Sequence, residues 1–117
     1  MAEKKVKVAI VGASGYSGEE LVRLLLEHPH VNLSIITSRQ HDGQSMVSVF
    51  PRFAGYNQAT DLKFSTPSID FLSEKADVVF LALPHGIAAE FAVPLVKKGV
   101  TVIDLSADFR INNAAVY

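Results

Sequence analysis

The sequence predicts an α/β protein built on a doubly wound parallel sheet. Apolar runs with strand character alternate with helix-like segments along the chain, which is typical of parallel sheets with helices on both faces. The first apolar run ends in three glycines spaced by three, and a helix-favouring stretch follows them directly. Because the chain has 117 residues, of which 49% are hydrophobic and 20% charged, we expect one compact domain over residues 1–117.

The first strand, the first helix and the second strand form the clearest unit. Val6–Val11 is a nearly continuous apolar run, which suits a strand buried on both faces. Residues 15–28 have the spacing of an amphipathic helix, which Pro29 ends. The apolar face of this helix consists of Leu21, Val22, Leu25 and Leu26. Val31–Thr37 is the second strand, and such a crossover is right-handed in nearly all known cases.

The remaining elements are shorter. We expect strands over residues 62–65, 77–83 and 100–105, and helices over residues 45–50, 68–75 and 87–98. Ser68 is placed to cap the second of these helices, with Phe71 and Leu72 facing inward.

The last helix combines helix-forming and helix-breaking residues. Ile87, Phe91 and Leu95 are spaced by four and predict one buried stripe. Gly99 is placed as a C-cap. Pro94 falls inside the helix and is expected to kink or shorten it, at a cost of about 3 kcal/mol in a straight helix.

The glycine turn after the first strand predicts a phosphate site in a Rossmann-like fold. Its pattern G-x-x-G-x-x-G differs from the usual dinucleotide fingerprint G-x-G-x-x-G, because Ser14 stands in place of the second glycine. We expect Gly12 to make the tight turn, Gly15 to admit a pyrophosphate and Gly18 to let the helix pack on the strand. Unpaired N–H groups at the helix start would bind the phosphate. The alternative is a glycine-rich turn without a ligand.

The end of the second strand indicates which dinucleotide is bound. Sites that prefer NAD usually carry an acidic residue here, which binds the ribose hydroxyls. This chain has Thr37-Ser38-Arg39 and no acid before Asp42. Arg39 can stack on adenine and pair with a 2′-phosphate, to which Ser38 can donate. We therefore predict NADP as the cofactor; the alternative is that Arg39 is a solvated loop charge.

Two further turns are expected at the same edge of the sheet. Leu83-Pro84-His85-Gly86 follows the fourth strand and would lie beside the cofactor. His85 is either an acid, a base or a phosphate contact, or a water-facing residue of a Pro-Gly turn. After the fifth strand, Ser106 can reach the cofactor. Arg110 can bind an anionic substrate, unless it forms a structural ion pair with Asp108.

Composition and charge argue against several classes of protein. A net charge of −1 and a pI near 6.4 give no electrostatic reason for a nucleic-acid or anionic membrane partner. No apolar run approaches the roughly 20 residues of a membrane span, and the apolar segment after the basic N-terminus is too short for a signal peptide. The sequence contains no cysteine, which excludes disulfides, thiolate metal sites and a cysteine nucleophile. We expect a cytoplasmic protein without a metal site.

Three segments resemble the N-terminal part of the N-acetyl-gamma-glutamyl-phosphate reductase family, which is related to aspartate-semialdehyde dehydrogenase. They are Gly12-Ala13-Ser14-Gly15-Tyr16-Ser17-Gly18, Leu83-Pro84-His85-Gly86 and Asp104-Leu105-Ser106-Ala107-Asp108-Phe109-Arg110. That family acts in arginine biosynthesis, where NADPH reduces N-acetyl-glutamyl 5-phosphate to the 5-semialdehyde through a cysteine thioester, assisted by a histidine. The resemblance implies a cofactor site made of Gly12, Ala13, Ser14, Gly15, Tyr16, Ser17, Gly18, Ser38, Arg39, Leu83, Pro84 and Ser106. It also implies a substrate contact for Arg110.

The sequence departs from this family's pattern in one respect that bears on catalysis. Family members continue into a substrate and dimerisation domain that carries the cysteine. The resemblance therefore implies that residues 1–117 are a truncated NADP-binding domain from which the catalytic domain is absent. We expect no catalytic residue in this chain, no turnover by it alone, and a homo-oligomer for the full-length enzyme.

Other functions share some of these features. The equivalent aminoadipate reductase of lysine biosynthesis, or aspartate-semialdehyde dehydrogenase itself, would have a similar cofactor domain. An atypical short-chain reductase would share the glycine turn, but the Tyr-x-x-x-Lys pair of that class is absent, since Tyr16 is followed by Glu20 and Tyr56 by Thr60. A stand-alone NADP-sensing module would fit the length and the missing nucleophile.

Overall fold

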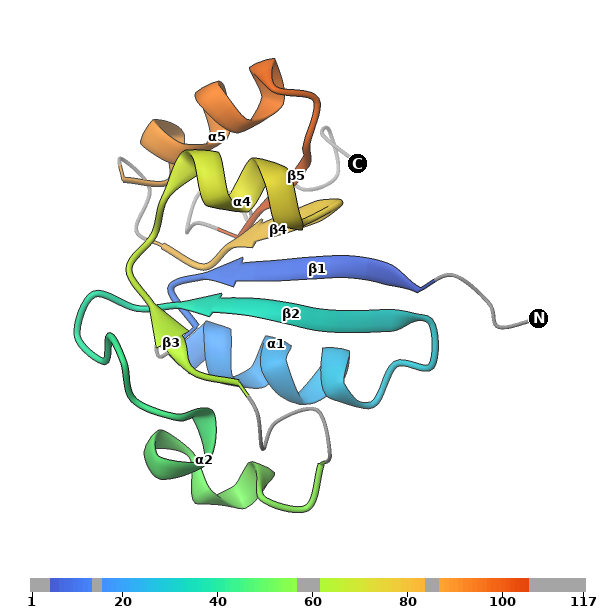
Figure 1. Cartoon of the computed structure of the whole chain (residues 1–117), viewed down its shortest axis with the longest axis vertical. Coiled ribbons are helices and arrows are strands. Elements are labelled where there is room, and N and C mark those ends of the chain that lie inside the picture. Colours follow the sequence, from blue (N-terminus) through green and yellow to red (C-terminus); the bar gives the residue numbers. More distant parts are fainter. Residues whose placement is uncertain (1–4, 14–15, 57–61, 84–86, 106–117) are drawn as a thin grey trace.

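The computed structural model describes residues 5–13, 16–56, 62–83 and 87–105, which form one five-stranded parallel sheet with helices on both faces (Figure 1). The strands are β1 (Val6–Val11), β2 (Val31–Thr37), β3 (Phe64–Ser65), β4 (Val78–Leu81) and β5 (Thr101–Asp104). Their order is β3-β2-β1-β4-β5, and every neighbouring pair is parallel. This confirms the predicted Rossmann-like, doubly wound α/β sheet in a single domain. The order reverses between β1 and β4, where ligands bind in such sheets.

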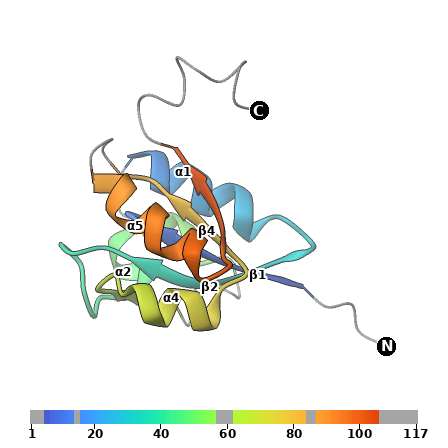
Figure 2. The ribbon, with the colours of Figure 1, turned by 90° about the horizontal axis from the view of Figure 1, so that it is seen from above.

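The helices cover the two faces of the sheet in pairs (Figure 1, Figure 2). They are α1 (Tyr16–Leu26), α2 (Met46–Val49), α4 (Ile69–Lys75) and α5 (Ile87–Lys97), with a 3₁₀ turn η1 (Pro51–Phe53) after α2. Val8 and Ile10 of β1 belong to the core beneath α1 and α2, whereas Ala9 and Val11 belong to the core beneath α4 and α5. All four side chains are at most 2% exposed. From Val8 to Val11 the central strand is therefore buried on both faces, as its nearly continuous apolar run predicts.

The first βαβ unit follows the predicted pattern, with a shorter helix. α1 buries Val22, Leu25 and Leu26, which are three residues of the expected apolar face. It ends at Leu26 rather than at residue 28, and the N–H of His28 donates to the carbonyl of Leu25 in a turn. The early end has a local cause, because a residue that precedes proline, here His28 before Pro29, is disfavoured in the helical conformation.

α4 confirms the predicted cap and corrects one predicted core residue. The Ser68 hydroxyl accepts a hydrogen bond from the N–H of Phe71, as expected for an N-cap. Leu72 is fully buried, but Phe71 is 44% exposed, so its inward orientation was a wrong prediction. A helix of seven residues presents one narrow face to the sheet, and Leu72 occupies that face, with the buried C-cap residue Ala76 following the helix.

The C-terminus of α5 is capped as predicted. Gly99 has a φ of +89°, its N–H donates to the carbonyl of Val96, and the N–H of Val100 donates to that of Leu95. These two bonds form a Schellman motif. Val100 and Leu95 both lie in the core, so the cap also fixes the entry of the chain into β5.

Pro94 lies inside α5 without ending it. The helix continues to Lys97, one residue short of the expected end, so the predicted shortening is minor. Phe91 and Leu95 are 7% and 0% exposed, and this burial on either side of the proline helps to hold the helix together. Ile87, the first residue of the expected stripe, is 40% exposed.

The segment after α2 is tied to α1 by an ion pair, and to the residue that follows α1 by a short hydrogen bond. The Tyr56 hydroxyl donates to the Glu27 carboxylate at 2.6 Å, and Arg52 pairs with Glu19 at 3.1 Å. The bond to Glu27 raises the pKa of Tyr56 above its ordinary value of 10.0. Because the folded pKa is raised, this bond stabilises the fold fully below about pH 10. Its contribution is lost as the pH rises through the folded pKa.

Glu27→Gln is expected to lower the pKa of Tyr56 toward its ordinary value, because the negatively charged acceptor is removed. The measurement is a spectrophotometric titration of tyrosinate in a background in which Tyr16 and Tyr117 are replaced by phenylalanine. An unchanged Tyr56 pKa in the Glu27→Gln chain would show that the bond does not persist in solution.

Candidate functional site

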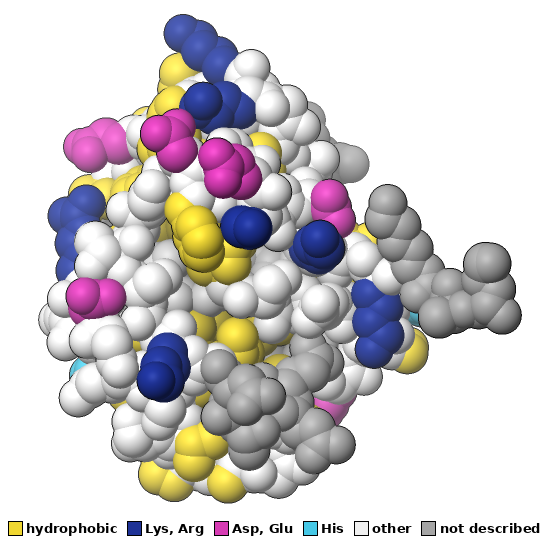
Figure 3. All heavy atoms as spheres, viewed as in Figure 1, with side chains coloured by type: hydrophobic (Ala, Val, Ile, Leu, Met, Phe, Trp, Pro, Cys, Tyr) yellow, Lys and Arg dark blue, Asp and Glu magenta, His cyan; other side chains and the backbone are white. Residues whose placement is uncertain are grey.

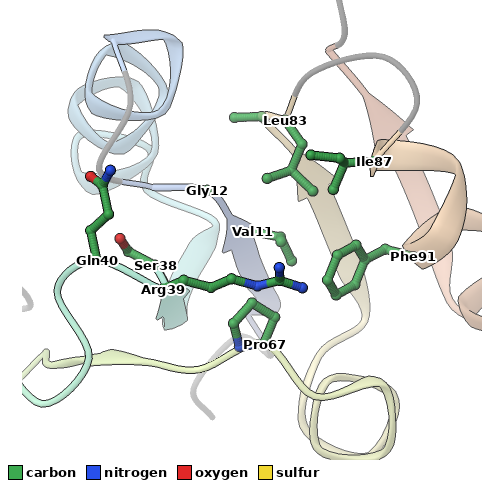
Figure 4. A pocket seen from close by; sticks show the side chains of 10 residues that line it. Val11, Gly12, Ser38, Arg39, Gln40, Pro67, Leu83, Ile87 and Phe91 are labelled. Carbon is green, nitrogen blue, oxygen red and sulfur yellow. The ribbon is translucent and has the colours of Figure 1, made fainter.

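A pocket of about 290 Å³ lies where the carboxyl ends of β1, β2 and β4 meet (Figure 4). This is the edge of the sheet at which the strand order reverses. The pocket is lined by Val11, Gly12, Ser38, Arg39, Gln40, Pro67, Ala82, Leu83, Ile87 and Phe91. Three of its lining residues begin turns that directly follow strands: Gly12 after β1, Ser38 after β2 and Ala82 after β4.

Gly12 makes the tight turn after β1, and no side chain fits there. Its φ is +86°, a left-handed conformation. A Cβ atom at this position would lie 2.5 Å from the carbonyl oxygen of Ala82. The N–H groups of Gly12 and Ala13 both donate to the carbonyl of Thr37, at 3.1 and 2.9 Å. The turn is therefore clamped between the ends of β2 and β4.

Gly18 lets α1 pack directly on that turn. A Cβ atom at Gly18 would lie 2.5 Å from the carbonyl oxygen of Gly12 and 2.8 Å from the backbone of Ala13. The backbone of the first turn of α1 thus touches the backbone that follows β1. This is the packing role expected for the third glycine, whereas its place in a cofactor site stays a prediction.

The loop after β2 supplies the polar wall of the pocket. Ser38 is 5% exposed, and its N–H donates to the carbonyl of Ser65. Arg39 and Gln40 are exposed at the pocket rim. Figure 4 shows the Arg39 guanidinium extending across the pocket toward Phe91, while the Gln40 amide points to the side of α1. Within the described part of the chain, Arg39 has no ion-pair partner.

The opposite wall is apolar. Leu83 follows β4, and Ile87 and Phe91 project from the first turns of α5 (Figure 4). Val11 and Pro67 complete this side, and in the view of Figure 4 the Arg39 side chain runs between them. A flat apolar group could lie against this wall, with a cation on its other face.

The structure thus brings together four of the predicted site residues, Gly12, Ser38, Arg39 and Leu83. Ala13 is buried beside the turn, and Gly18 lies behind it. Tyr16 and Ser17 begin α1, but their side chains fall outside the described residues. Also outside the described residues are Ser14, Gly15, Pro84, His85, Ser106 and Arg110.

The described residues contain no group of three or more His, Cys, Asp or Glu side chains that could hold a metal ion. None of the described helices is both long and apolar enough to cross a bilayer. On the face shown in Figure 3, acidic and basic side chains are interspersed rather than gathered by sign.

A family model for the NAD-binding domain of semialdehyde dehydrogenase matches residues 7–117. The chain belongs to that family. The matched range includes every element of the sheet except Val6, the first residue of β1. The glycine turn, the β2 loop and the pocket all lie within this NAD-binding domain.

Curated relatives carry two kinds of reductase name. The domain is 52% identical over 115 residues to the N-acetyl-gamma-glutamyl-phosphate reductase of Akkermansia muciniphila, a match that covers 97% of this chain and 33% of that protein. It is 48% identical over 113 residues to the [LysW]-L-2-aminoadipate/[LysW]-L-glutamate phosphate reductase of Saccharolobus solfataricus, covering 97% of this chain and 31% of that protein. The chain therefore spans about a third of the length of these relatives.

Solved structures confirm the fold. Aspartate-semialdehyde dehydrogenase from Candida albicans, solved with NADP, matches with a TM-score of 0.68 at 22% identity, over 92% of this chain and 31% of that one. A Rex-family repressor matches with a TM-score of 0.62 at 17% identity, over 97% of this chain and 62% of that one. At these identities the likeness concerns the fold alone.

Sequence reasoning missed six residues that line the pocket of this semialdehyde dehydrogenase domain: Val11, Gln40, Pro67, Ala82, Ile87 and Phe91. Gln40 could have been found, because it directly follows Arg39 on the loop. Ile87 and Phe91 were assigned to a buried stripe, and only the position of α5 beside β4 shows that they also face the pocket. Pro67 reaches the site because β3 pairs with β2.

Proposed function

We propose that this chain is the NADP(H)-binding domain of an acyl-phosphate reductase that forms a semialdehyde. The observation that carries the proposal is the pocket itself. A glycine turn without room for side chains, an apolar wall and an arginine without an ion-pair partner in the described residues converge at the reversal of strand order. Relatives named as phosphate reductases support the reaction class.

The residues present fit a dinucleotide. We assign the pyrophosphate to the start of α1, because the first backbone N–H groups of a helix have no partner within the helix. Gly12 and Gly18 let the turn after β1 and the start of α1 pack backbone against backbone beneath it. The adenosine would fill the pocket, with its base against Leu83, Ile87 and Phe91 and the Arg39 guanidinium over it. When bound, the cofactor supplies the hydride. The chain's own residues bind and orient it.

The choice of NADP rests on the end of β2. No carboxylate follows Thr37 where NAD sites usually carry one. Instead, the buried Ser38 is followed by Arg39, a cation with no ion-pair partner in the described residues. A 2′-phosphate would supply that partner.

For the whole protein we propose reduction of N-acetyl-glutamyl 5-phosphate to N-acetyl-glutamate 5-semialdehyde with NADPH, in arginine biosynthesis, by a cytoplasmic homo-oligomer. The nucleophilic cysteine and most of the substrate pocket would come from outside these 117 residues, and Arg110 would contact the substrate. A second candidate is the aminoadipate reductase of lysine biosynthesis. It is favoured by the LysW-type relative, whose 48% identity is close to the 52% of the arginine-type relative.

The experiment is a fluorescence titration of the purified chain with NADPH, followed by an assay of phosphate-dependent NADP⁺ reduction by N-acetyl-glutamate semialdehyde. We expect saturable binding of NADPH and no turnover, because the chain contains no cysteine. Absence of binding would contradict the proposed cofactor site. Turnover by the pure chain would contradict the placement of the nucleophile elsewhere.

A further inference from the structure

Two consecutive side chains of the β2 loop point to different parts of the pocket. Arg39 and Gln40 are both exposed and both line it. The Arg39 guanidinium extends over Pro67 toward Phe91, on the apolar side, whereas the Gln40 amide rises on the side of α1 (Figure 4). The charged group thus lies where a base would stack, and the neutral amide lies nearer the glycine turn.

The Gln40 amide is available to a ligand. In the described part of the chain, its side chain has no hydrogen-bond partner. An amide offers two N–H donors and one carbonyl acceptor. The Ser38 hydroxyl points to the same side of the loop (Figure 4), so two neutral polar groups face that part of the pocket.

We infer that Gln40 reads the 2′-position of the adenosine ribose and, together with Arg39, sets the preference between NADP and NAD. This inference rests on the proposed function, because it assumes that the pocket holds adenosine. The ribose 2′-group of a bound dinucleotide lies beside the loop that follows the second strand. The Gln40 amide can donate to a 2′-phosphate through its N–H groups, or accept from a 2′-hydroxyl through its oxygen. Arg39 then stacks on the base with its planar guanidinium and pairs with the 2′-phosphate through its charge.

The inference predicts that one substitution shifts the preference. Gln40→Glu keeps the size of the side chain, removes both donors and adds a negative charge. A carboxylate repels a 2′-phosphate but accepts from 2′- and 3′-hydroxyls. We expect NADP⁺ to bind at least about tenfold more weakly, as for a like charge placed near a surface phosphate. The affinity for NAD⁺ should stay the same or rise.

Asn32→Asp is the matched control. Asn32 is also an exposed amide on β2, but it lies near the amino end of the strand, where it pairs in register with Lys7, and it does not line the pocket. The substitution makes the same change from amide to carboxylate at the opposite end of the sheet. We expect it to change the dissociation constants of NADP⁺ and NAD⁺ by less than about twofold, because solvent screens charges at such distances. Gln40→Ala, which removes the donors without adding charge, should weaken NADP⁺ binding less than Gln40→Glu does.

The experiment is a calorimetric titration of wild type and the three variants with NADP⁺ and with NAD⁺, after thermal melts have shown that each chain is folded. A loss of NADP⁺ affinity confined to the Gln40 variants supports the inference. Equal weakening of both cofactors by Gln40→Glu, or no change in either, overturns it while the proposed function stands. Failure of the wild type to bind either cofactor overturns the proposed function and the inference with it.

Discussion

Gly12→Ala is expected to lower the free energy of unfolding by about 2–5 kcal/mol, as the strain of a left-handed alanine adds to that of an overpacked contact. The φ of +86° is unfavourable for alanine, and the added Cβ would lie 2.5 Å from the Ala82 carbonyl oxygen. That oxygen belongs to backbone at the end of β4, so it cannot rotate away as a flexible side chain would. Urea denaturation measures the loss.

Gly43→Ala is the matched control for this substitution. Gly43 has the same φ of +86°, but nothing lies within 4 Å of an added Cβ. The free energy of unfolding of Gly43→Ala should therefore fall only by the cost of a left-handed alanine, about 1–2 kcal/mol. The difference between the two variants isolates the contact with Ala82. Equal losses would mean that the glycine turn is not clamped against β4.

Arg39→Ala is expected to weaken NADP⁺ binding by about 1.5–3 kcal/mol, the scale of a charge-assisted hydrogen bond. Binding of NAD⁺ should weaken far less, because it loses at most the stacking of an exposed cation, about 0.5–1 kcal/mol. Calorimetric titration with both cofactors gives the two values. The difference between the losses of binding free energy for NADP⁺ and NAD⁺ should narrow as the salt concentration rises, since screening weakens an exposed ion pair.

Lys5→Ala serves as the control for the loss of a positive charge. Lys5 is exposed and precedes β1, at the end of the sheet away from the pocket. Its removal should leave both affinities unchanged. If Arg39→Ala weakens NADP⁺ and NAD⁺ equally, then Arg39 does not bind a 2′-phosphate and the assignment to NADP loses its main support.

The sheet could be predicted from the sequence because its central strand is apolar at every position except Lys7. A nearly continuous run such as Val6–Val11 is compatible with a strand buried on both faces, and the structure places alternate residues in two cores. The glycine spacing was informative because two of these glycines stand where a larger side chain would meet backbone. Backbone lies within 3 Å of the missing Cβ atoms of Gly12 and Gly18, so these positions exclude a larger residue.

The apolar wall of the pocket could not be predicted from local pattern. Ile87 and Phe91 have the spacing of a buried helix face, which is the same whether the face meets the sheet or a ligand. Pro67 enters the site only because β3 adds to the sheet beside β2. The predicted inward orientation of Phe71 was wrong for a related reason. The pattern of a short helix does not show which of two adjacent apolar residues, Phe71 or Leu72, meets the sheet.

The central claim is that the carboxyl ends of β1, β2 and β4 hold NADP. The most direct test is an NMR titration of the isotope-labelled chain with NADP⁺, in which perturbations of the assigned backbone amides are mapped on the sheet. The account predicts saturable shifts concentrated at Gly12, Ser38, Arg39, Gln40 and Leu83, with smaller shifts at the amino ends of the strands. Saturable shifts centred elsewhere, or none at millimolar NADP⁺, would contradict it.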